Sequence, residues 1–281
     1  MKKVGLALSS GATRGGFAIG VGRALLKAGI HVDMVSGSSV GSLGVIGFGL
    51  EMSLDFMEEW AERTKVWQYI RPETKDDLGV LNCGQILKRV TDVVGDLQFS
   101  QFKIPVVMAA LDLETSEVAF FKDGSVLEAL RASIGAPSLF PPLRKNNRYY
   151  VDAGLVDPLP IDVLRNMGAE VIIAVDQGPI GKNKMQFLKE HKLHIPILEE
   201  IDHVHSSWVV LNHVGGALHR NAINRAIEIQ RPDYVVSTAL ALKKSGVCHD
   251  ITFTDTSCFK KLADLGEEEA NLIIPDILKK L

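Results

Sequence analysis

This 281-residue chain has few cysteines, a small net charge and no long apolar run, and each of these features argues against a class of protein. The three cysteines are odd in number and lack metal-ligand spacing, so we expect free thiols in a reducing cytoplasm. The formal net charge of −3 offers no basic surface for nucleic acid, so no nucleic-acid partner is expected. No apolar run reaches the length of about 18 residues that a membrane-spanning helix needs.

Nothing in the composition divides the chain into parts. There is no internal repeat, low-complexity tract, charge block or linker-like segment, and the apolar run 4–8 is too short for the core of a signal peptide. Hydrophobic residues make up 46% of the chain and charged residues 23%, a globular composition with a sizeable core. We therefore expect one domain over residues 1–281, in a cytoplasmic protein for which peripheral membrane contact stays open.

Segments with strand and helix patterns alternate along the chain, which predicts an α/β fold with a mainly parallel central sheet. Strands are expected at 2–8, 31–37, 104–113, 117–121, 148–154, 169–176 and 233–238. Helices are expected at 16–29, 40–52, 53–67, 82–95, 125–135, 160–168 and 198–228, and over most of 259–281.

A G-x-S-x-G pattern, "GSSVG" at 37–41, lies between an expected strand and an expected helix. In that context the pattern is typical of a turn that exposes a nucleophilic serine, with flanking glycines that leave room for the backbone and the substrate. Ser39 is therefore a candidate nucleophile, supported by Gly37 and Gly41. The alternative is that Ser39 is one small residue in an ordinary strand–helix connection.

A second small-residue turn, "SSGATRGG" at 9–16, follows the first expected strand. Parallel neighbouring strands bring such turns to the same edge of the sheet, where α/β proteins bind ligands. Acyl transfer needs donors for the developing oxyanion, and the amides of Gly11 and Ala12 are candidates. Arg14 fits three interpretations: it orients the loop, meets an anionic head group, or is simply solvated.

A nucleophilic serine also needs a base, and Asp152 is a better candidate than any of the eight histidines. No histidine lies in a turn that singles it out. Asp152 directly follows an expected strand and precedes Ala153 and Gly154, so its carboxylate is able to point into the same crevice. A carboxylate accepts a serine proton in a partly dry site, although its pKa in water is only about 3.9. A turn-forming or helix-capping aspartate is the alternative. Neither a metal nor a cofactor is expected, because no H-E-x-x-H motif or Cys/His cluster occurs.

Taken together, "SGATRG" (10–15), "GSSVG" (37–41) and "DAG" (152–154) resemble the motifs of the patatin-like phospholipase family, and so does "ASIGAPSLFPPL" (132–143). The resemblance covers about residues 3–175 and is looser beyond them. It implies a three-layer α/β/α fold and a Ser–Asp dyad without histidine. The implied roles are nucleophile Ser39, base Asp152, oxyanion-hole residues Gly11 and Ala12, and supporting residues Arg14, Gly37, Gly41 and Gly154.

The chain departs from the family pattern at four small residues. Serine or alanine stands where many members have glycine at Ser9, Ser10, Ala12 and Ala153. Ala12 keeps its amide but restricts the backbone, and a methyl group at Ala153 is tolerable only with a negative φ.

The resemblance implies hydrolysis of carboxylic esters of lipids through an acyl-serine intermediate. A patatin-like scaffold with a binding or regulatory role and little turnover is the alternative. A short-chain dehydrogenase is disfavoured, since Phe17 replaces the third glycine of its turn and no Tyr-x-x-x-Lys motif occurs. An ordinary α/β-hydrolase is disfavoured because only one clear strand precedes that of Ser39.

Two apolar segments are candidates for binding lipid, and each also has a purely structural interpretation. The helix at 40–52 supplies either an acyl groove with glycines that leave space, or plain core. The aromatic residues of 58–72 fit either an interfacial lid or a helix with partly buried aromatics. The oligomeric state has no signature in the sequence.

Overall fold

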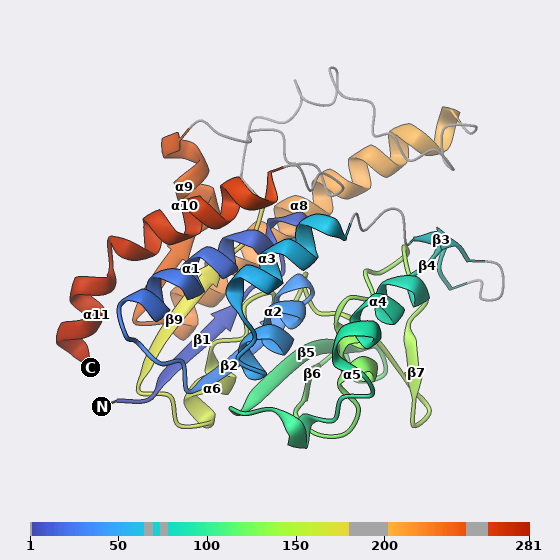
Figure 1. Ribbon diagram of the computed structural model, residues 1–281. Coiled ribbons are helices and arrows are strands. Elements are labelled where there is room, and N and C mark those ends of the chain that lie inside the picture. The colour runs from blue at the N-terminus through green and yellow to red at the C-terminus, as the bar shows by residue number, and fades with distance from the viewer. Residues whose placement is uncertain (1, 65–69, 74–77, 180–201, 246–257) are drawn as a thin grey trace.

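The protein is described by a computed structural model that covers residues 2–64, 70–73, 78–179, 202–245 and 258–281. Within these residues, an eight-stranded sheet has the order β10-β9-β1-β2-β5-β8-β7, and β6 pairs with β5 as well. Helices cover both of its faces (Figure 1). The α/β fold predicted from the alternating pattern, with its three layers, is therefore confirmed.

Four of the strand pairings are parallel and three are antiparallel. The parallel pairs join β10, β9, β1, β2 and β5, whereas β6, β7 and β8 run antiparallel to their neighbours. The strands of this sheet are β1 (Val4–Leu8), β2 (Met34–Ser38), β5 (Val106–Asp112), β6 (Val118–Phe121), β7 (Leu143–Lys145), β8 (Arg148–Asp152), β9 (Val171–Asp176) and β10 (Tyr234–Ser237). A separate ribbon consists of β3 (Arg71–Pro72) and β4 (Leu81–Asn82).

The helices fill most of the connections between these strands. They are η1 (Ala12–Gly15), α1 (Gly16–Lys27), α2 (Val40–Gly49), α3 (Leu54–Arg63), α4 (Gly84–Val94), η3 (Phe99–Gln101), α5 (Val126–Ser133), α6 (Asp162–Asn166), α8 (Asp202–Gln230), α9 (Thr238–Ser245), α10 (Phe259–Asn271) and α11 (Ile274–Lys280).

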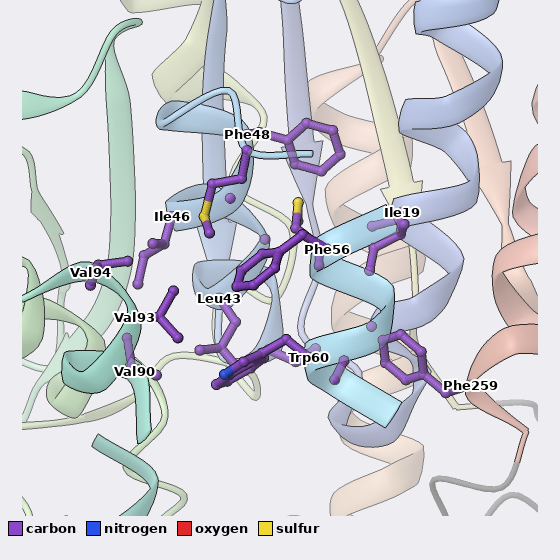
Figure 2. Close-up of a pocket in the computed structure, with 18 residues that line it drawn as sticks. Ile19, Leu43, Ile46, Phe48, Phe56, Trp60, Val90, Val93, Val94 and Phe259 are labelled. Carbon is purple, nitrogen blue, oxygen red and sulfur yellow. The ribbon is translucent and has the colours of Figure 1, made fainter. Parts of the chain in front are cut away.

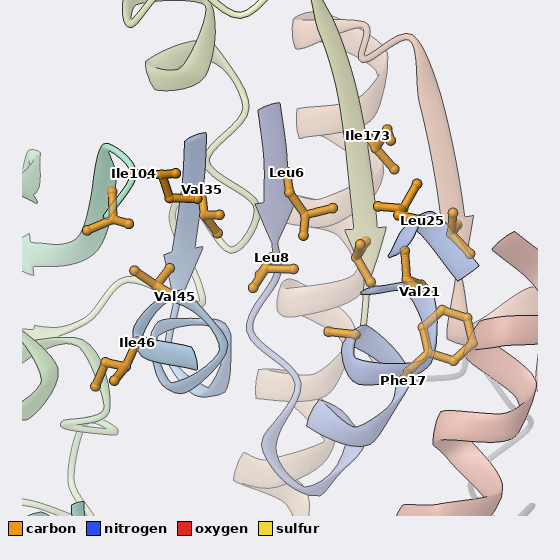
Figure 3. Packing of buried hydrophobic residues seen from close by; sticks show 14 of the residues in the cluster. Leu6, Leu8, Phe17, Val21, Leu25, Val35, Val45, Ile46, Ile104 and Ile173 are labelled. Atoms are coloured by element: carbon orange, nitrogen blue, oxygen red, sulfur yellow. The ribbon is translucent and has the colours of Figure 1, made fainter. Parts of the chain in front are cut away.

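Alternate residues of each central strand point to two separate cores, because successive side chains of a strand lie on opposite faces of the sheet. Leu6 and Leu8 of β1 pack on the face covered by α1 and α2, where Phe17 and Val21 meet them (Figure 3). Ala7, between the two leucines, packs on the other face with residues of α6 and α8. The continuous apolar run that predicted a buried strand thus serves two helical layers.

Helix α10 lies directly against α1, because glycines remove the side chains between the two helices (Figure 1). A Cβ atom at Gly20 would overlap the backbone carbonyl of Ala263, and one at Gly266 would overlap that of Phe17. The two helices therefore meet backbone to backbone, and the C-terminal segment belongs to the same packed layer as the first helix.

Several boundaries differ from the sequence-based expectations. The second strand begins at Met34 and not at residue 31, and the short strand β7 and the helix α9 were not predicted. β7 has three residues and lies at the sheet edge beside β8 alone, so its conformation depends on that pairing more than on its own pattern. Part of the aromatic segment 58–72, including Trp67 and Tyr69, lies outside the described residues.

The cysteine prediction is wrong at one position. Cys83 is free and buried, as expected, but Cys258 at the start of α10 is disulfide-bonded. Cysteine usage therefore gives no support to the cytoplasmic location that we inferred from three free thiols. Among the described helices, none combines the length and the apolar character that crossing a membrane requires.

The α1–α10 contact generates a stability prediction. Replacing Gly20 by alanine should push the helices apart and lower the free energy of unfolding by about 1–3 kcal/mol, a typical penalty for overpacking. The matched control is Gly215→Ala, because nothing lies within 4 Å of a Cβ at this α8 glycine. That change should be neutral or stabilising by up to about 1 kcal/mol. Urea denaturation of both variants measures the difference, and equal stabilities would contradict the close packing.

Candidate active site

The edge of β5 brings together two segments that are far apart in the sequence. Ser38 pairs with Ala109 of β5, and Asp152 pairs with the next residue, Ala110. Both alanines also pair with β6, which therefore occupies the opposite edge of β5. β2 and β8 consequently follow one another along the same edge, and the end of β2 meets the end of β8. This register places Ser39 beside Asp152.

Ser39 occupies a strained turn between β2 and α2. Its backbone angles are φ 56° and ψ −123°. Residues other than glycine seldom adopt this conformation, which costs about 1–3 kcal/mol. A Cβ at Gly37 would lie 2.6 Å from the carbonyl of Gly41, and one at Gly41 would overlap the carbonyl of Leu8. Both glycines of the pattern are therefore required by close backbone contacts, in agreement with the supporting role expected for them.

The C-terminal end of α5 and the residues after it form hydrogen bonds to both the serine turn and the aspartate strand. The Ser39 amide donates to the Ser133 hydroxyl at 2.9 Å, and the Asp152 amide donates to the carbonyl of Gly135 at 2.9 Å. Ser133 also exchanges a hydrogen bond of 2.7 Å with Ser42 in the first turn of α2. The segment 132–143, which the sequence related to the family pattern, thus ties the serine turn to the aspartate strand.

The first small-residue turn lies against the serine turn. A Cβ at Gly15 would come within 2.8 Å of the Val40 side chain, next to Ser39. Within the described part of the chain, the amides of Gly11 and Ala12 donate to no protein acceptor, whereas the amides of Ser9 and Ser10 are both bonded. Two adjacent amides of this turn are therefore donors without a protein acceptor among the described residues, the kind of group that an oxyanion site needs.

Asp152 is a partly buried carboxylate that the Gly154 amide and the Ser39 hydroxyl both approach. Burial raises its pKa to about 6, while hydrogen bonds from the Ser39 hydroxyl and the Gly154 amide oppose that rise. The Gly154 amide lies 2.7 Å from Oδ1. The aspartate is thus held toward the serine, and its affinity for a proton is well above that of an aspartate in water.

The two alanine departures have different backbone conformations. Ala12 has a φ of 51°, a left-handed conformation that costs about 1–2 kcal/mol without glycine. Ala153 has a negative φ and is fully buried, so its methyl group is accommodated in the way that the sequence required. Only the first departure places strain at the candidate oxyanion site.

Arg14 links the first turn to the segment that follows β9. Its Nε donates to the backbone carbonyl of Gln177 at 2.6 Å, just after β9. Burial and the neighbouring Arg220 lower its pKa to about 10, with Asp176 opposing, so Arg14 remains cationic at neutral pH. Of the interpretations left open by the sequence, these contacts favour orientation of the loop.

His219 is a neighbour of the site that sequence reasoning did not single out. Its Nε2 lies 2.6 Å from the Ser10 hydroxyl in the first turn. The two residues are 209 positions apart, and nothing in the local pattern around His219 predicts where α8 docks.

An apolar cavity reaches Val40, the residue after Ser39, and its space, with the open solvent at its mouth, is about 720 Å³. Gly15 of the first turn also lines it and lies close to the Val40 side chain. Its other walls come from α1, α2, α3, α4 and α10 (Figure 2). The apolar side chains labelled there are Ile19, Leu43, Ile46, Phe48, Phe56, Trp60, Val90, Val93, Val94 and Phe259.

Helix α2 contributes to both the cavity and the core. Leu43 and Ile46 line the cavity, whereas Val45 is fully buried in the core. Gly44 and Gly47 of α2 also line the cavity. A Cβ at Gly44 would lie 2.6 Å from Leu8 and one at Gly47 would overlap Met57, so these glycines also let α2 approach its neighbours.

The part of the chain that the structure describes contains no cluster of three or more histidine, cysteine or acidic side chains able to hold a metal ion. The polar groups around Ser39 are one carboxylate, hydroxyls and backbone amides. Such a set suits proton transfer and oxyanion binding.

The fold and the site define an α/β protein with a serine on a strained strand–helix turn, beside a partly buried carboxylate and near a second turn of small residues. A family profile described as patatin-like phospholipase matches residues 6–165, more than half of the chain. The chain belongs to the patatin-like phospholipase family.

Named relatives agree with this assignment. An uncharacterized NTE family protein of Mycobacterium bovis is 34% identical over 176 residues, which are 62% of this chain and 48% of that protein. Lysophospholipase nte1 of Aspergillus niger is 28% identical over 66% of this chain, and patatin-like phospholipase domain-containing protein 6 of Mus musculus is 31% identical over 62%. The chain matches only 12% of the fungal protein's length and 13% of the mouse protein's.

A solved structure supports the fold. The crystal structure of VipD from Legionella pneumophila aligns with 98% of this chain and 67% of its own, with a TM-score of 0.50 and 13% identity. At this identity the match concerns the architecture alone.

The raised pKa of Asp152 generates a stability prediction. The folded-state pKa of about 6 exceeds the ordinary aspartate pKa of 3.8, so between these values the native state holds a proton that the unfolded chain has lost. The stabilisation is full below pH 3.8 and is lost as the pH rises through 6. Asp152→Asn should therefore raise the free energy of unfolding at pH 8 by about 1–3 kcal/mol, and by little at pH 4.

Chemical denaturation at several pH values measures this difference. The exposed Asp123→Asn is the matched control and should stay within about 0.5 kcal/mol of the parent at every pH. Asp157, whose pKa burial and Asp162 also raise to about 6, should leave some pH dependence in the Asp152 variant. A loss of stability at pH 8 in Asp152→Asn would show that the buried carboxylate does not carry the expected cost.

Proposed function

We propose that the protein is a serine acyl hydrolase that cleaves carboxylic esters of lipids through an acyl-Ser39 intermediate. The observation that carries the proposal is the closeness of the Ser39 hydroxyl to the partly buried Asp152 carboxylate, whose pKa the hydroxyl lowers while burial raises it. The family description and the printed name lysophospholipase of the fungal relative support a lipid ester as substrate. Since the chain matches only part of each relative, the activity of the whole protein is itself a proposal.

In the proposed reaction, Asp152 accepts the hydroxyl proton as the Ser39 oxygen attacks the ester carbonyl carbon. The C=O pair moves onto the oxygen, which the amides of Gly11 and Ala12 stabilise. When the carbonyl re-forms, the bond to the alcohol breaks and Asp152 returns its proton to that alcohol. Water then attacks the carbonyl carbon of the acyl-serine while Asp152 accepts its proton. When the carbonyl re-forms, the bond to the Ser39 oxygen breaks, Asp152 returns the proton to that oxygen, and the carboxylic acid leaves.

A pKa of about 6 suits Asp152 to this role. The carboxylate is still the main form at neutral pH, yet it holds a proton more strongly than an aspartate in water does. The resulting protonated acid is also strong enough to protonate the leaving alcohol. A histidine is not required when burial itself supplies the basicity.

The cavity beside Ser39 is the proposed acyl-chain site. Its walls are almost entirely apolar, which suits a hydrocarbon chain. Val40 lines it next to Ser39, so a chain lying in the cavity would have its carboxyl end at the serine. Trp60 and Phe56 belong to its wall, and these residues of α3 therefore act as part of the acyl site.

We also propose that residues 1–281 form a single domain. β10 pairs with β9, and α10 packs on α1, so the last part of the chain extends the sheet and the helical layer of the first part. Transient contact with a lipid surface follows from the proposed substrate class, and the location of the protein in the cell stays a prediction.

The dyad makes a direct prediction about activity. Ser39→Ala and Asp152→Asn should each lower kcat/KM for an acyl ester by about 10³-fold, or about 4 kcal/mol. A fluorophosphonate probe should label the parent protein and fail to label Ser39→Ala. The exposed Ser100→Ala is the control and should keep both labelling and turnover. An inert parent protein that no probe labels would favour the binding or regulatory alternative.

The cavity predicts how chain length is selected. Ala61 of α3 lines it, so Ala61→Phe should fill part of the space and lower kcat/KM for a dodecanoyl ester about tenfold relative to a butyryl ester. Glu59→Phe adds the same side chain on the same helix, at an exposed position outside the cavity. This control should leave the ratio of the two esters unchanged. If Ala61→Phe also leaves the ratio unchanged, the acyl chain binds elsewhere.

A further inference from the structure

We propose that His219 and Ser10 form a positioning pair that holds the oxyanion loop, residues 9–15, in its active geometry. In this role His219 acts through Ser10 and does not serve as the base. The inference rests on the proposed function, and it assigns a task to α8, which lies outside all three motifs of the site.

The contact itself is direct and buried. The Ser10 hydroxyl lies 2.6 Å from Nε2 of His219, and Ser10 is only 3% exposed. On its other side, a Cβ at Gly154 would come within 3.1 Å of the same hydroxyl and 3.0 Å of Asp152 Oδ1. Ser10 therefore lies between His219 and the turn at 152–154. A shift of His219 would displace Ser10 and, through it, this turn.

Helix α8 is itself fixed where it carries His219. The next residue, Arg220, forms an ion pair of 2.6 Å with Asp176 at the end of β9, and its Nε donates to the carbonyl of Pro179. Ser237 of β10 donates to the same Asp176 oxygen at 2.7 Å. One turn further, Ile223 is fully buried in the core. His219 thus approaches the loop from a rigid support.

The loop needs such support because it is strained. Ala12, with a φ of 51°, follows Ser10 by two residues, and a strained conformation persists only where its surroundings determine it. The neighbouring Ser9 contributes in the same way, because its hydroxyl accepts from the Gln177 amide at 2.7 Å. Glycine at positions 9 and 10 would offer neither hydroxyl, so in this chain the two serine departures are anchoring points.

The electrostatic surroundings of His219 favour a neutral ring. The charged groups that face it are Arg14 of η1, Arg220 on its own helix and Asp176 of β9. Burial, together with the two arginines, lowers its pKa to about 4. A neutral imidazole has one acceptor and one donor, which suits a hydroxyl partner. A base for Ser39 is already supplied by Asp152.

A positioning role makes a specific kinetic prediction. The oxyanion forms only in the transition state, so a displaced loop lowers kcat and leaves KM nearly unchanged. His219→Ala and Ser10→Gly should each lower kcat about 10- to 100-fold, and the double variant should lose no more than the larger single loss. His219→Gln, whose amide reaches a similar position, should recover kcat to within about threefold of the parent.

The experiment measures kcat, KM and the rate of fluorophosphonate labelling for the full chain and these variants. Asn224→Ala, an exposed change on the same helix, is the control and should match the parent. Should His219→Ala fail to fold, Ser10→Gly and His219→Gln test the same pair. An unchanged kcat, losses that simply add, or a rise in KM alone would each overturn the positioning role.

Two outcomes separate this inference from the proposed function. A parent protein that neither turns over esters nor reacts with the phosphonate would refute the function, and the positioning role with it. An active parent protein with a fully active His219→Ala variant would refute only the positioning role. Labelling that moves from Ser39 to Ser10 would refute both the assigned nucleophile and the anchoring task of Ser10.

Discussion

The interaction between the Ser39 hydroxyl and the partly buried Asp152 carboxylate is the one on which the proposed chemistry depends. It exists because β2 and β8 end at consecutive residues along one edge of β5. A shift of β8 by one residue would turn the aspartate to the other face of the sheet, since side chains alternate along a strand. The hydrogen bonds of β5 to β2 and β8 therefore set the relative position of Ser39 and Asp152, although neither residue belongs to β5.

The site combines several features that cost stability. Ser39 and Ala12 have positive φ values, and Asp152 is a carboxylate away from water. The surrounding backbone contacts compensate, because α5 binds both halves of the site and close glycine contacts hold α2 against β1. Such concentrated strain is typical of catalytic sites, where the geometry serves the reaction at the expense of the fold.

The C-terminal third of the chain takes part in the site although the three motifs end before it. α10 forms part of the wall of the apolar cavity through Phe259, and α8 brings His219 to the first turn. Sequence reasoning placed no residue of these segments in the site, because a helix sequence does not tell which of its faces will contact a distant loop. Cys258 is a comparable case, since spacing alone did not indicate a disulfide at the start of α10.

By itself the sequence determined the α/β class, the strand–turn–helix around Ser39 and the small turns at 9–16 and 152–154. These features depend on neighbouring residues, whose alternation, glycine content and polarity can be read locally. Only the tertiary structure decided that the Ser39 and Asp152 side chains meet, that five helices enclose an apolar cavity, and that His219 reaches Ser10. The reason is physical: strand register and helix docking are fixed by contacts between residues far apart in the chain, and no local pattern specifies them.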